Sequence, residues 1–187
     1  MAVLPIVEIP DPRLRQMCEP IATIDDEVRQ LVADMTDTMY YAHGIGLAAI
    51  QVGVLRRVVV IDLQDRQSDE PVEEGEAPAT VRDPKAYINP EILWVSDELS
   101  RYQEGCLSIP EQYAEVERPA RCRVAWLDVD GNRHEDEQDG DRLHASSNLE
   151  RSANLSGTSC CGKPPQAAFL RAFASFFSSM SRFRRVM

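Results

Sequence analysis

Residue types that can do chemistry gather in two short stretches of the chain. The first stretch, residues 44–53, reads GIGLAAIQVG. Glycines two positions apart let the backbone approach a ligand closely, because glycine has no Cβ. Gln51 adds a neutral amide whose NH₂ group can polarise a carbonyl or hold a developing oxyanion. The same residues also fit a helix end followed by a tight turn, and taken singly the stretch favours that structural interpretation.

The second stretch, residues 104–110, reads EGCLSIP. Its cysteine, Cys106, follows a glycine and can act as a nucleophile or as a thiolate ligand to a metal. The backbone N–H of Leu107 can stabilise an oxyanion at the same centre. The structural alternative is a buried free cysteine, because cysteine is among the most buried residue types, and the stretch alone favours it.

Together, the two stretches resemble the motifs of the peptide deformylase family, metallohydrolases that remove the formyl group from new N-terminal methionines. The opening LPIVEIPDPRLR and the run MYYAHGIGLAA resemble the same family, so the resemblance covers about residues 3–143. It implies an α+β fold in which an N-terminal helix and antiparallel strands surround a metal cleft. Ile50 departs from the family, whose members usually carry proline there, and we expect the change to be tolerated.

The resemblance also implies roles for individual residues. Cys106 would be a thiolate ligand to a divalent metal, Fe(II) or Zn. Gln51 and the Leu107 N–H would hold the formyl oxygen. The edge along which the methionyl peptide lies would be lined by Gly44, Ile45 and Gly46. The implied substrate is the formyl-methionyl end of a nascent peptide, which makes the ribosome an expected neighbour.

The family's third motif, His-Glu-x-x-His, is missing from this sequence. That motif supplies two histidine ligands and a glutamate for proton transfer. The three histidines are His43, His134 and His144, and none is followed by the required residues. We expect His134 to be a surface histidine on a strand, His144 not to be a ligand, and His43 to lie at a helix end. The sequence therefore predicts feeble hydrolysis or none.

Patterns along the chain predict the elements that position these motifs. A helix begins near Asp26, capped by Asp25 or Thr23, and Gly44 is expected to end it. A buried strand is predicted over 54–63, an acidic loop over 64–84 and a further strand over 87–95. A hairpin is predicted from strands at 121–129 and 132–137, turning at Asp130-Gly131.

Charge divides the sequence near residue 143. Residues 1–143 hold 30 acidic and 14 basic side chains, whereas residues 144–187 hold one acidic and six basic side chains and all five phenylalanines. We therefore interpret 1–143 as a deformylase-like domain and 144–187 as a divergent tail, hypothetically translated out of frame. An amphipathic helix over 167–185 fits the spacing of its apolar residues, and the alternatives are an accidental pattern or a helix that packs on the domain.

Composition narrows the classes of function. A net charge of −11 makes a nucleic-acid partner a poor prediction. No apolar run approaches the roughly 20 residues that a membrane span needs. Five scattered cysteines suit a reducing cytoplasm rather than a disulfide framework. Two alternatives to the enzyme remain: a deformylase-like protein that binds methionyl peptides without hydrolysis, and a cysteine-centred hydrolase or redox protein, which ranks last because Cys106 has no evident His/Asp pairing.

Overall fold

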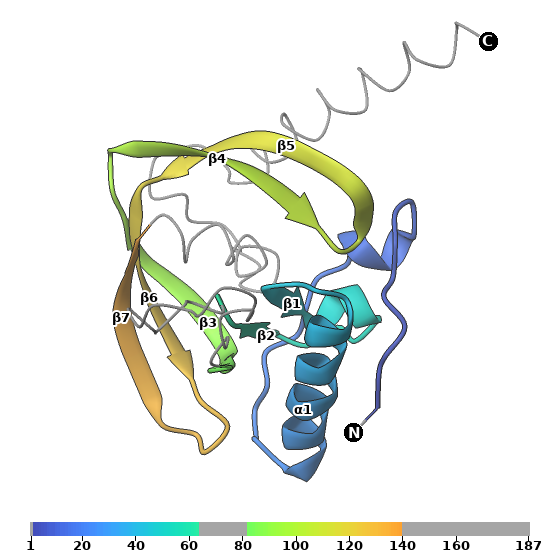
Figure 1. Cartoon of the computed structure of the whole chain (residues 1–187). Coiled ribbons are helices and arrows are strands. Elements are labelled where there is room, and N and C mark those ends of the chain that lie inside the picture. Colours follow the sequence, from blue (N-terminus) through green and yellow to red (C-terminus); the bar gives the residue numbers. More distant parts are fainter. Residues whose placement is uncertain (1, 64–81, 140–187) are drawn as a thin grey trace, which may run out of the picture. The chain divides into compact units, whose positions relative to one another are not determined.

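The computed structural model describes residues 2–63 and 82–139. Its described elements run in the order η1 (Pro12–Arg15), α1 (Asp26–Tyr41), β1 (Gly46–Ala48), η2 (Ala49–Val52), β2 (Val58–Ile61), β3 (Lys85–Val95), β4 (Leu99–Cys106), β5 (Ile109–Pro119), β6 (Arg121–Leu127) and β7 (Arg133–Asp139). One α-helix and antiparallel strands make up this part of the chain (Figure 1), which confirms the expected α+β class. The predicted tail from 144, its helix over 167–185 and His144 lie outside the described residues.

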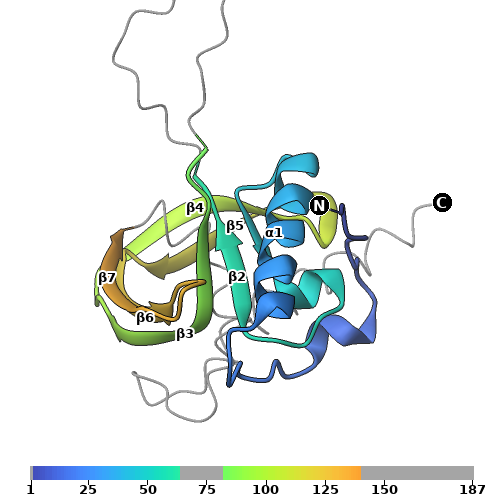
Figure 2. The ribbon, with the colours of Figure 1, turned by 90° about the horizontal axis from the view of Figure 1, so that it is seen from below.

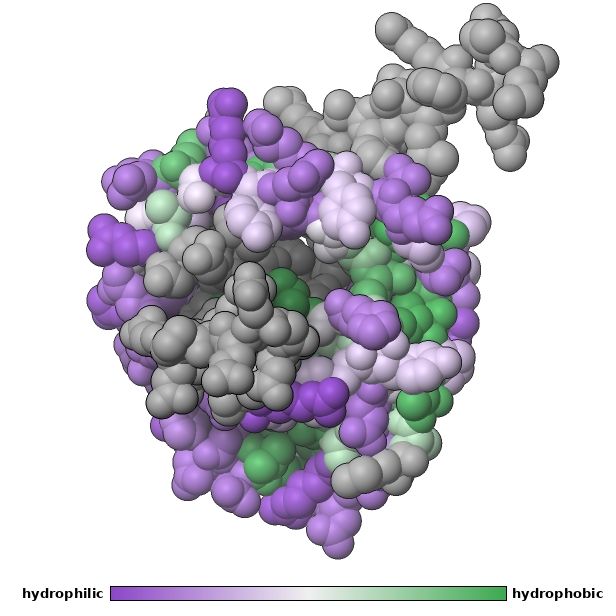
Figure 3. All heavy atoms as spheres, in the orientation of Figure 1, coloured by the Kyte–Doolittle hydropathy of each residue, from purple (hydrophilic) through white to green (hydrophobic). Residues whose placement is uncertain are grey.

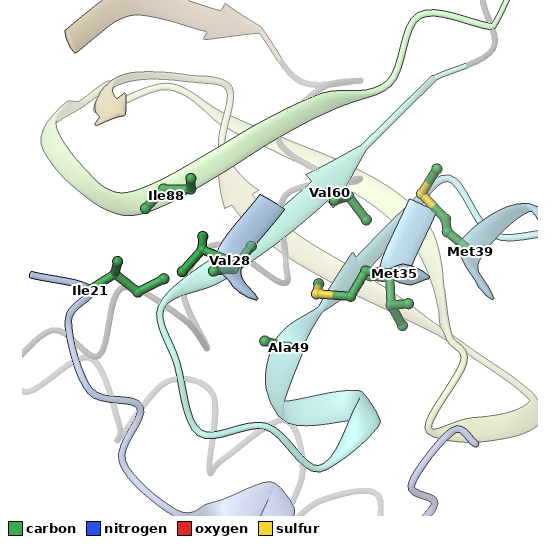
Figure 4. Close-up of a cluster of buried hydrophobic side chains, with 9 residues drawn as sticks. Ile21, Val28, Met35, Met39, Ala49, Val60 and Ile88 are labelled. Atoms are coloured by element: carbon green, nitrogen blue, oxygen red, sulfur yellow. The ribbon is translucent and has the colours of Figure 1, made fainter. Parts of the chain in front are cut away.

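Helix α1 begins where the sequence predicts it. The Asp25 side chain accepts a hydrogen bond from the N–H of Val28 at 3.0 Å, which satisfies one of the free donors of the first turn. Val28, Met35 and Met39 recur on one face and are fully buried. Figure 4 shows this face packed against β2, with Val60 and Ala49 among its neighbours. Burial of this apolar face fixes the helix on the sheet.

The end of α1 corrects one expectation. The helix ends at Tyr41, and His43, not Gly44, takes the left-handed conformation, with φ 54°. The N–H of His43 bonds to the carbonyl of Tyr40 at 3.1 Å, and the N–H of Gly44 bonds to the carbonyl of Met39 at 2.9 Å. This is the Schellman pattern, which satisfies the last carbonyls of the helix. Gly44 therefore does not supply the left-handed residue at the helix end.

The main sheet has five antiparallel strands in the order β1-β2-β3-β6-β7. Strand β2 is buried on both faces. Val58 and Val60 belong to the same apolar cluster as Val28, Met35 and Met39 of α1, called the α1 cluster below, whereas Val59 and Ile61 belong to a second apolar cluster. The predicted strand over 54–63 is too long at its N-terminal end. Residues there pair with other segments: the N–H of Val54 bonds to Ala49, and Leu55 accepts from Glu19.

The other sequence predictions for strands vary in accuracy. Strand β3 confirms the prediction over 87–95, and β6–β7 confirms the hairpin, with Gly131 at φ 85° in its turn. Most of the predicted loop over 64–84 lies outside the described residues. No helix in the described ranges is long and apolar enough to cross a membrane.

Strands β4 and β5 form a separate two-stranded hairpin that the sequence analysis did not predict. Figure 1 shows it as an arch that leaves the main sheet and returns to it, and Figure 2 shows the same arch from below. Its register shifts between Gly105 and Cys106, where the chain turns. The arch thus carries the EGCLSIP stretch away from the strands that precede and follow it.

Candidate active site

The structure brings the two motif stretches together. The amide nitrogen Nε2 of Gln51, on η2, lies 3.6 Å from Sγ of Cys106, at the end of β4. The same nitrogen donates to Oγ of Ser108 at 3.2 Å. Gln51 and Ser108 are fully buried, whereas Cys106 is half-buried. A buried amide and a half-buried thiol therefore lie side by side.

The orientation of the Gln51 amide is fixed from behind. Its Oε1 accepts a hydrogen bond from the backbone N–H of Ala48 at 2.9 Å. An N–H donor requires an oxygen acceptor, so the oxygen end of the amide must face Ala48 and the NH₂ end must face Cys106 and Ser108. Glutamine at this position is consequently held as a donor toward the thiol side, as a carbonyl-binding amide would need.

The segment before η1 ties the two halves of the site together. The N–H of Val7 bonds to the carbonyl of Gln51 at 2.7 Å, and the N–H of Ile9 bonds to the carbonyl of Ser108 at 3.0 Å. Residues two positions apart on one extended segment thus hold η2 on one side and the turn after Cys106 on the other. This connection fixes the spacing of Gln51 and Ser108 independently of their side chains.

Gly44 lies directly against the neighbouring motif. A Cβ added at Gly44 would lie 2.7 Å from Cδ1 of Leu107 and 3.5 Å from the carbonyl oxygen of Met39. The missing side chain therefore makes room for Leu107, which packs against the α1 cluster. The helix end and the turn after Cys106 meet at this point.

Ile45 and strand β1 directly follow Gly44 in the chain. Ile45 is 44% exposed, and its carbonyl accepts from the N–H of Asp62 at 2.9 Å. Gly46 is buried and pairs with Ile61 of β2. Figure 3 shows apolar surface among the hydrophilic side chains of the face seen in Figure 1. An exposed apolar side chain beside an edge strand suits a contact with an extended peptide.

A polar cluster supports this strand from α1. The hydroxyl of Tyr40 donates to Oδ2 of Asp62, a residue only 4% exposed, and the N–H of Asp83 donates to the same oxygen at 3.0 Å. The guanidinium of Arg82 lies 4.3 Å from the centre of the Tyr40 ring. Burial, followed by the hydrogen bond to Asp62 and its negative charge, raises the pKa of Tyr40 above its usual value. Tyr40 therefore stays a neutral donor at physiological pH.

The described residues do not fit a complete metal centre of the kind that the resemblance implies. Such a centre needs three protein ligands and an open position. Within 2–63 and 82–139, no three His, Cys, Asp or Glu side chains come together as metal ligands. His134 is exposed on β7, with Nε2 2.7 Å from Asp128, which confirms it as a surface histidine. His43 is also exposed, at the end of α1.

Sequence reasoning missed three residues that contribute to the site. Ser108 lies inside the quoted EGCLSIP stretch, and a hydroxyl two positions from the cysteine is a signal that could have drawn attention to it. Val7 and Ile9 act through backbone N–H groups, and no side-chain pattern marks such a role. Every predicted site residue, by contrast, lies at or beside the junction of α1, β1, η2 and the β4–β5 turn.

Comparison with known proteins gives a consistent result. The model of the polypeptide deformylase family matches residues 3–145. A curated peptide deformylase of Novosphingobium aromaticivorans is 55% identical over 147 residues, covering 75% of this chain and 78% of the relative. One of Rhizorhabdus wittichii is 54% identical over 140 residues, covering 75% of each chain.

Solved structures are similar as well. The peptide deformylase of Thermotoga maritima superposes with a TM-score of 0.70 at 31% identity, covering 83% of this chain and 95% of that one. The enzyme of Ehrlichia chaffeensis gives a TM-score of 0.68 at 32% identity, covering 100% and 99%. The family match, the close relatives and the fold all agree, and this chain belongs to the polypeptide deformylase family.

Proposed function

We propose that this chain binds the formyl-methionyl end of a nascent peptide and that, with the sequence it has, it removes the formyl group feebly. In this proposal the Gln51 amide and the Leu107 N–H hold the formyl oxygen. The peptide runs along Gly44, Ile45 and Gly46. The observation that carries the proposal is the Gln51 amide, buried, fixed by Ala48 and directed at the Cys106 sulfur.

The expected weakness of hydrolysis follows from the donor set. Cys106 is the proposed thiolate ligand of a divalent metal, Fe(II) or Zn, as the resemblance implies. Metal affinity depends on ligand number and geometry, and a single thiolate holds such an ion poorly. The sequence contains no His-Glu-x-x-His, and the described residues form no three-ligand group. We therefore expect a member of this family without its metal ligands to lose hydrolysis of the formyl-methionyl peptide more than binding of it.

Binding without hydrolysis is the second candidate function. It is favoured by the contrast between the intact arrangement of Gln51, Cys106 and Ser108 and the missing histidine motif. The proposed partner is the same nascent peptide, met at the ribosome and in the cytoplasm, since both follow from the family's role in protein biosynthesis.

Three measurements on the purified full chain test these candidates. Hydrolysis of a formyl-methionyl tripeptide is compared with that by the Novosphingobium relative, and metal per chain is determined in parallel. We expect a rate at least about tenfold below the relative's and less than one metal ion per chain. A rate within tenfold contradicts the proposed impairment. Calorimetry then measures binding of the tripeptide, with the unformylated peptide as control. It separates a chain that binds without hydrolysis from a chain that neither binds nor hydrolyses the peptide.

The origin of residues 144–187 forms part of this proposal. We propose that the tail is translated out of frame, which accounts for the change of charge and the loss of the third motif in the same place. Translating the coding DNA beyond codon 140 in the other two frames tests this directly. A His-Glu-x-x-His in one of them is the expected result, and its absence from both means that the tail arose in another way.

A further inference from the structure

A buried ion pair lies across the β4–β5 hairpin, close to the site. Nε of Arg118 lies 2.6 Å from Oε1 of Glu104, and Nη2 lies 2.9 Å from Oε2. The two side chains are only 9% and 10% exposed. Two parallel N–H···O bonds between a guanidinium and a carboxylate fix direction as well as distance.

The strand register shows that the pair spans a long stretch of the hairpin. Glu104 stands opposite Ala114, and Arg118 stands opposite Ser100, so the partners are four positions apart along the strands. In an extended strand four positions correspond to about 13 Å. The contact passes over the intervening pair Tyr102–Val116 on the same face of the hairpin.

That face is buried at some positions only: Tyr102 is 50% exposed and Ala114 is exposed, whereas the ion pair is covered. Glu104, Cys106 and Arg118 are buried or half-buried, whereas their immediate strand neighbours are mostly exposed. Figure 1 shows the hairpin arched. Side chains stand roughly perpendicular to a sheet, so partners four positions apart meet most readily where the strands bend toward them. The pair therefore joins two points of the arch that lie four positions apart along its strands.

We propose that the Glu104–Arg118 pair is a positioning device that holds the arch at the curvature that places the Cys106 sulfur beside the Gln51 amide. Glu104 is two residues from Cys106 on the same face of β4. If the strand changed direction at Glu104, the end of β4 that carries Cys106 would move with it. The inference rests on the proposed function only in taking Cys106 as a site residue.

Energetics favour a geometric role over a simple stabilising one. A buried ion pair often contributes little net stability, because both charges lose their hydration, although removing one partner is costly. The opposite face of the same hairpin carries exposed pairs, Arg101 with Glu115 and with Glu117, at 3.8 and 3.5 Å. Exposed pairs of this kind contribute little, which makes Arg101 a matched control.

The test measures alkylation of individual cysteines in the full chain by iodoacetamide, followed by mass spectrometry of the labelled peptides. Cys106 reports on the site, while Cys18 and Cys122, at 3% and 1% exposure, report on general opening of the fold. The variants are Arg118→Lys, which keeps the charge but loses the two-point geometry, and Glu104→Gln/Arg118→Met, which removes both charges of the pair together. Arg101→Lys is the control.

We expect both variants to raise the Cys106 alkylation rate about tenfold while the Cys18 and Cys122 rates stay unchanged, and the control to change none of them. An unchanged Cys106 rate in both variants overturns the inference. A parallel rise at all three cysteines also overturns it, because the pair would then only stabilise the fold. Neither result depends on peptide binding or hydrolysis, so the proposed function is tested separately.

Discussion

Gln51 and Cys106 lie 55 positions apart in the sequence, yet Nε2 of Gln51 lies 3.6 Å from Sγ of Cys106. The two hydrogens on that nitrogen have two acceptors in the described structure, Oγ of Ser108 and the sulfur. In the proposed function, a formyl oxygen bound by this amide competes with the sulfur for one N–H, while Ser108 retains the other.

Replacing Gln51 by methionine tests how far this amide holds the site together. The variant keeps the volume but leaves the buried N–H of Ala48 without its acceptor. We expect the free energy of unfolding to fall by about 1–3 kcal/mol, measured by urea denaturation, because an unsatisfied buried polar group costs that much. Gln112→Met, at an exposed position of β5, is the control and should change stability by less than about 0.5 kcal/mol. Equal effects at the two positions would contradict the buried hydrogen-bond arrangement.

Substitution of Gly44 by alanine tests its contact with Leu107. The added Cβ would meet Cδ1 of Leu107 at 2.7 Å, so we expect a loss of about 1–3 kcal/mol from overpacking. In Gly44→Ala/Leu107→Ala the clash is removed, and the double variant should be more stable than the sum of the two single effects predicts. Thermal or urea unfolding of the four proteins in the cycle measures the coupling. Simple additivity would show that the two residues do not press on each other.

The Tyr40–Asp62 hydrogen bond makes stability depend on alkaline pH. Because the folded state raises the pKa of Tyr40, its contribution is fully present below about pH 10, the unfolded value, and is lost as pH rises further. We expect Tyr40→Phe to lower the free energy of unfolding by about 1.5–3 kcal/mol at pH 7, since a bond to a carboxylate is lost. The gap to the unmodified chain should narrow above pH 10.

Tyr41→Phe serves as the control for that measurement, because Tyr41 is 73% exposed and adjacent in sequence. It should change stability little at pH 7. Urea titrations at pH 7, 9 and 11 provide the comparison. A gap between Tyr40→Phe and the unmodified chain that stays constant from pH 7 to 11 would show that the hydroxyl is not held as described.

Metal binding can be traced to one sulfur. If Cys106 is the proposed ligand, Cys106→Ser should weaken Zn²⁺ binding by about tenfold or more in equilibrium dialysis, because a thiolate donor is lost. His134→Ala should leave Zn²⁺ binding unchanged, because that imidazole contacts Asp128 at the sheet surface. If His134→Ala weakened Zn²⁺ binding and Cys106→Ser left it unchanged, the assignment of Cys106 as the metal ligand would be wrong.

Short-range sequence patterns predicted the elements that are stabilised by contacts between residues close in sequence. Asp25 caps α1, and Gly131 turns the β6–β7 hairpin. The β4–β5 hairpin escaped prediction because its strands do not alternate regularly: β5 is exposed at six consecutive positions, from Pro110 to Glu115. Its form depends instead on a non-local contact, Glu104 with Arg118, which no periodicity reveals.

The same distinction holds for the candidate site, where some features could be predicted from the motifs and others could not. The proximity of Gln51 and Cys106 agrees with what the motif resemblance implies. The reason for Gly44 does not follow from sequence, because a glycine after a helix suggests a terminator, and here His43 takes that conformation while Gly44 makes room for Leu107. The functions of Val7 and Ile9 are carried by backbone amides, for which any residue except proline would serve.

The leading segment of the chain has a practical consequence for recombinant work. Backbone amides of Val7 and Ile9 bond to Gln51 and Ser108, and the N–H of Leu4 bonds to Oγ1 of Thr38 at 2.9 Å. Trimming the first nine residues, or introducing proline at position 7, would remove these hydrogen bonds while leaving Gln51 and Ser108 themselves unchanged. Fusion partners are therefore better attached through a spacer ahead of Ala2 than by replacing any residue of this stretch.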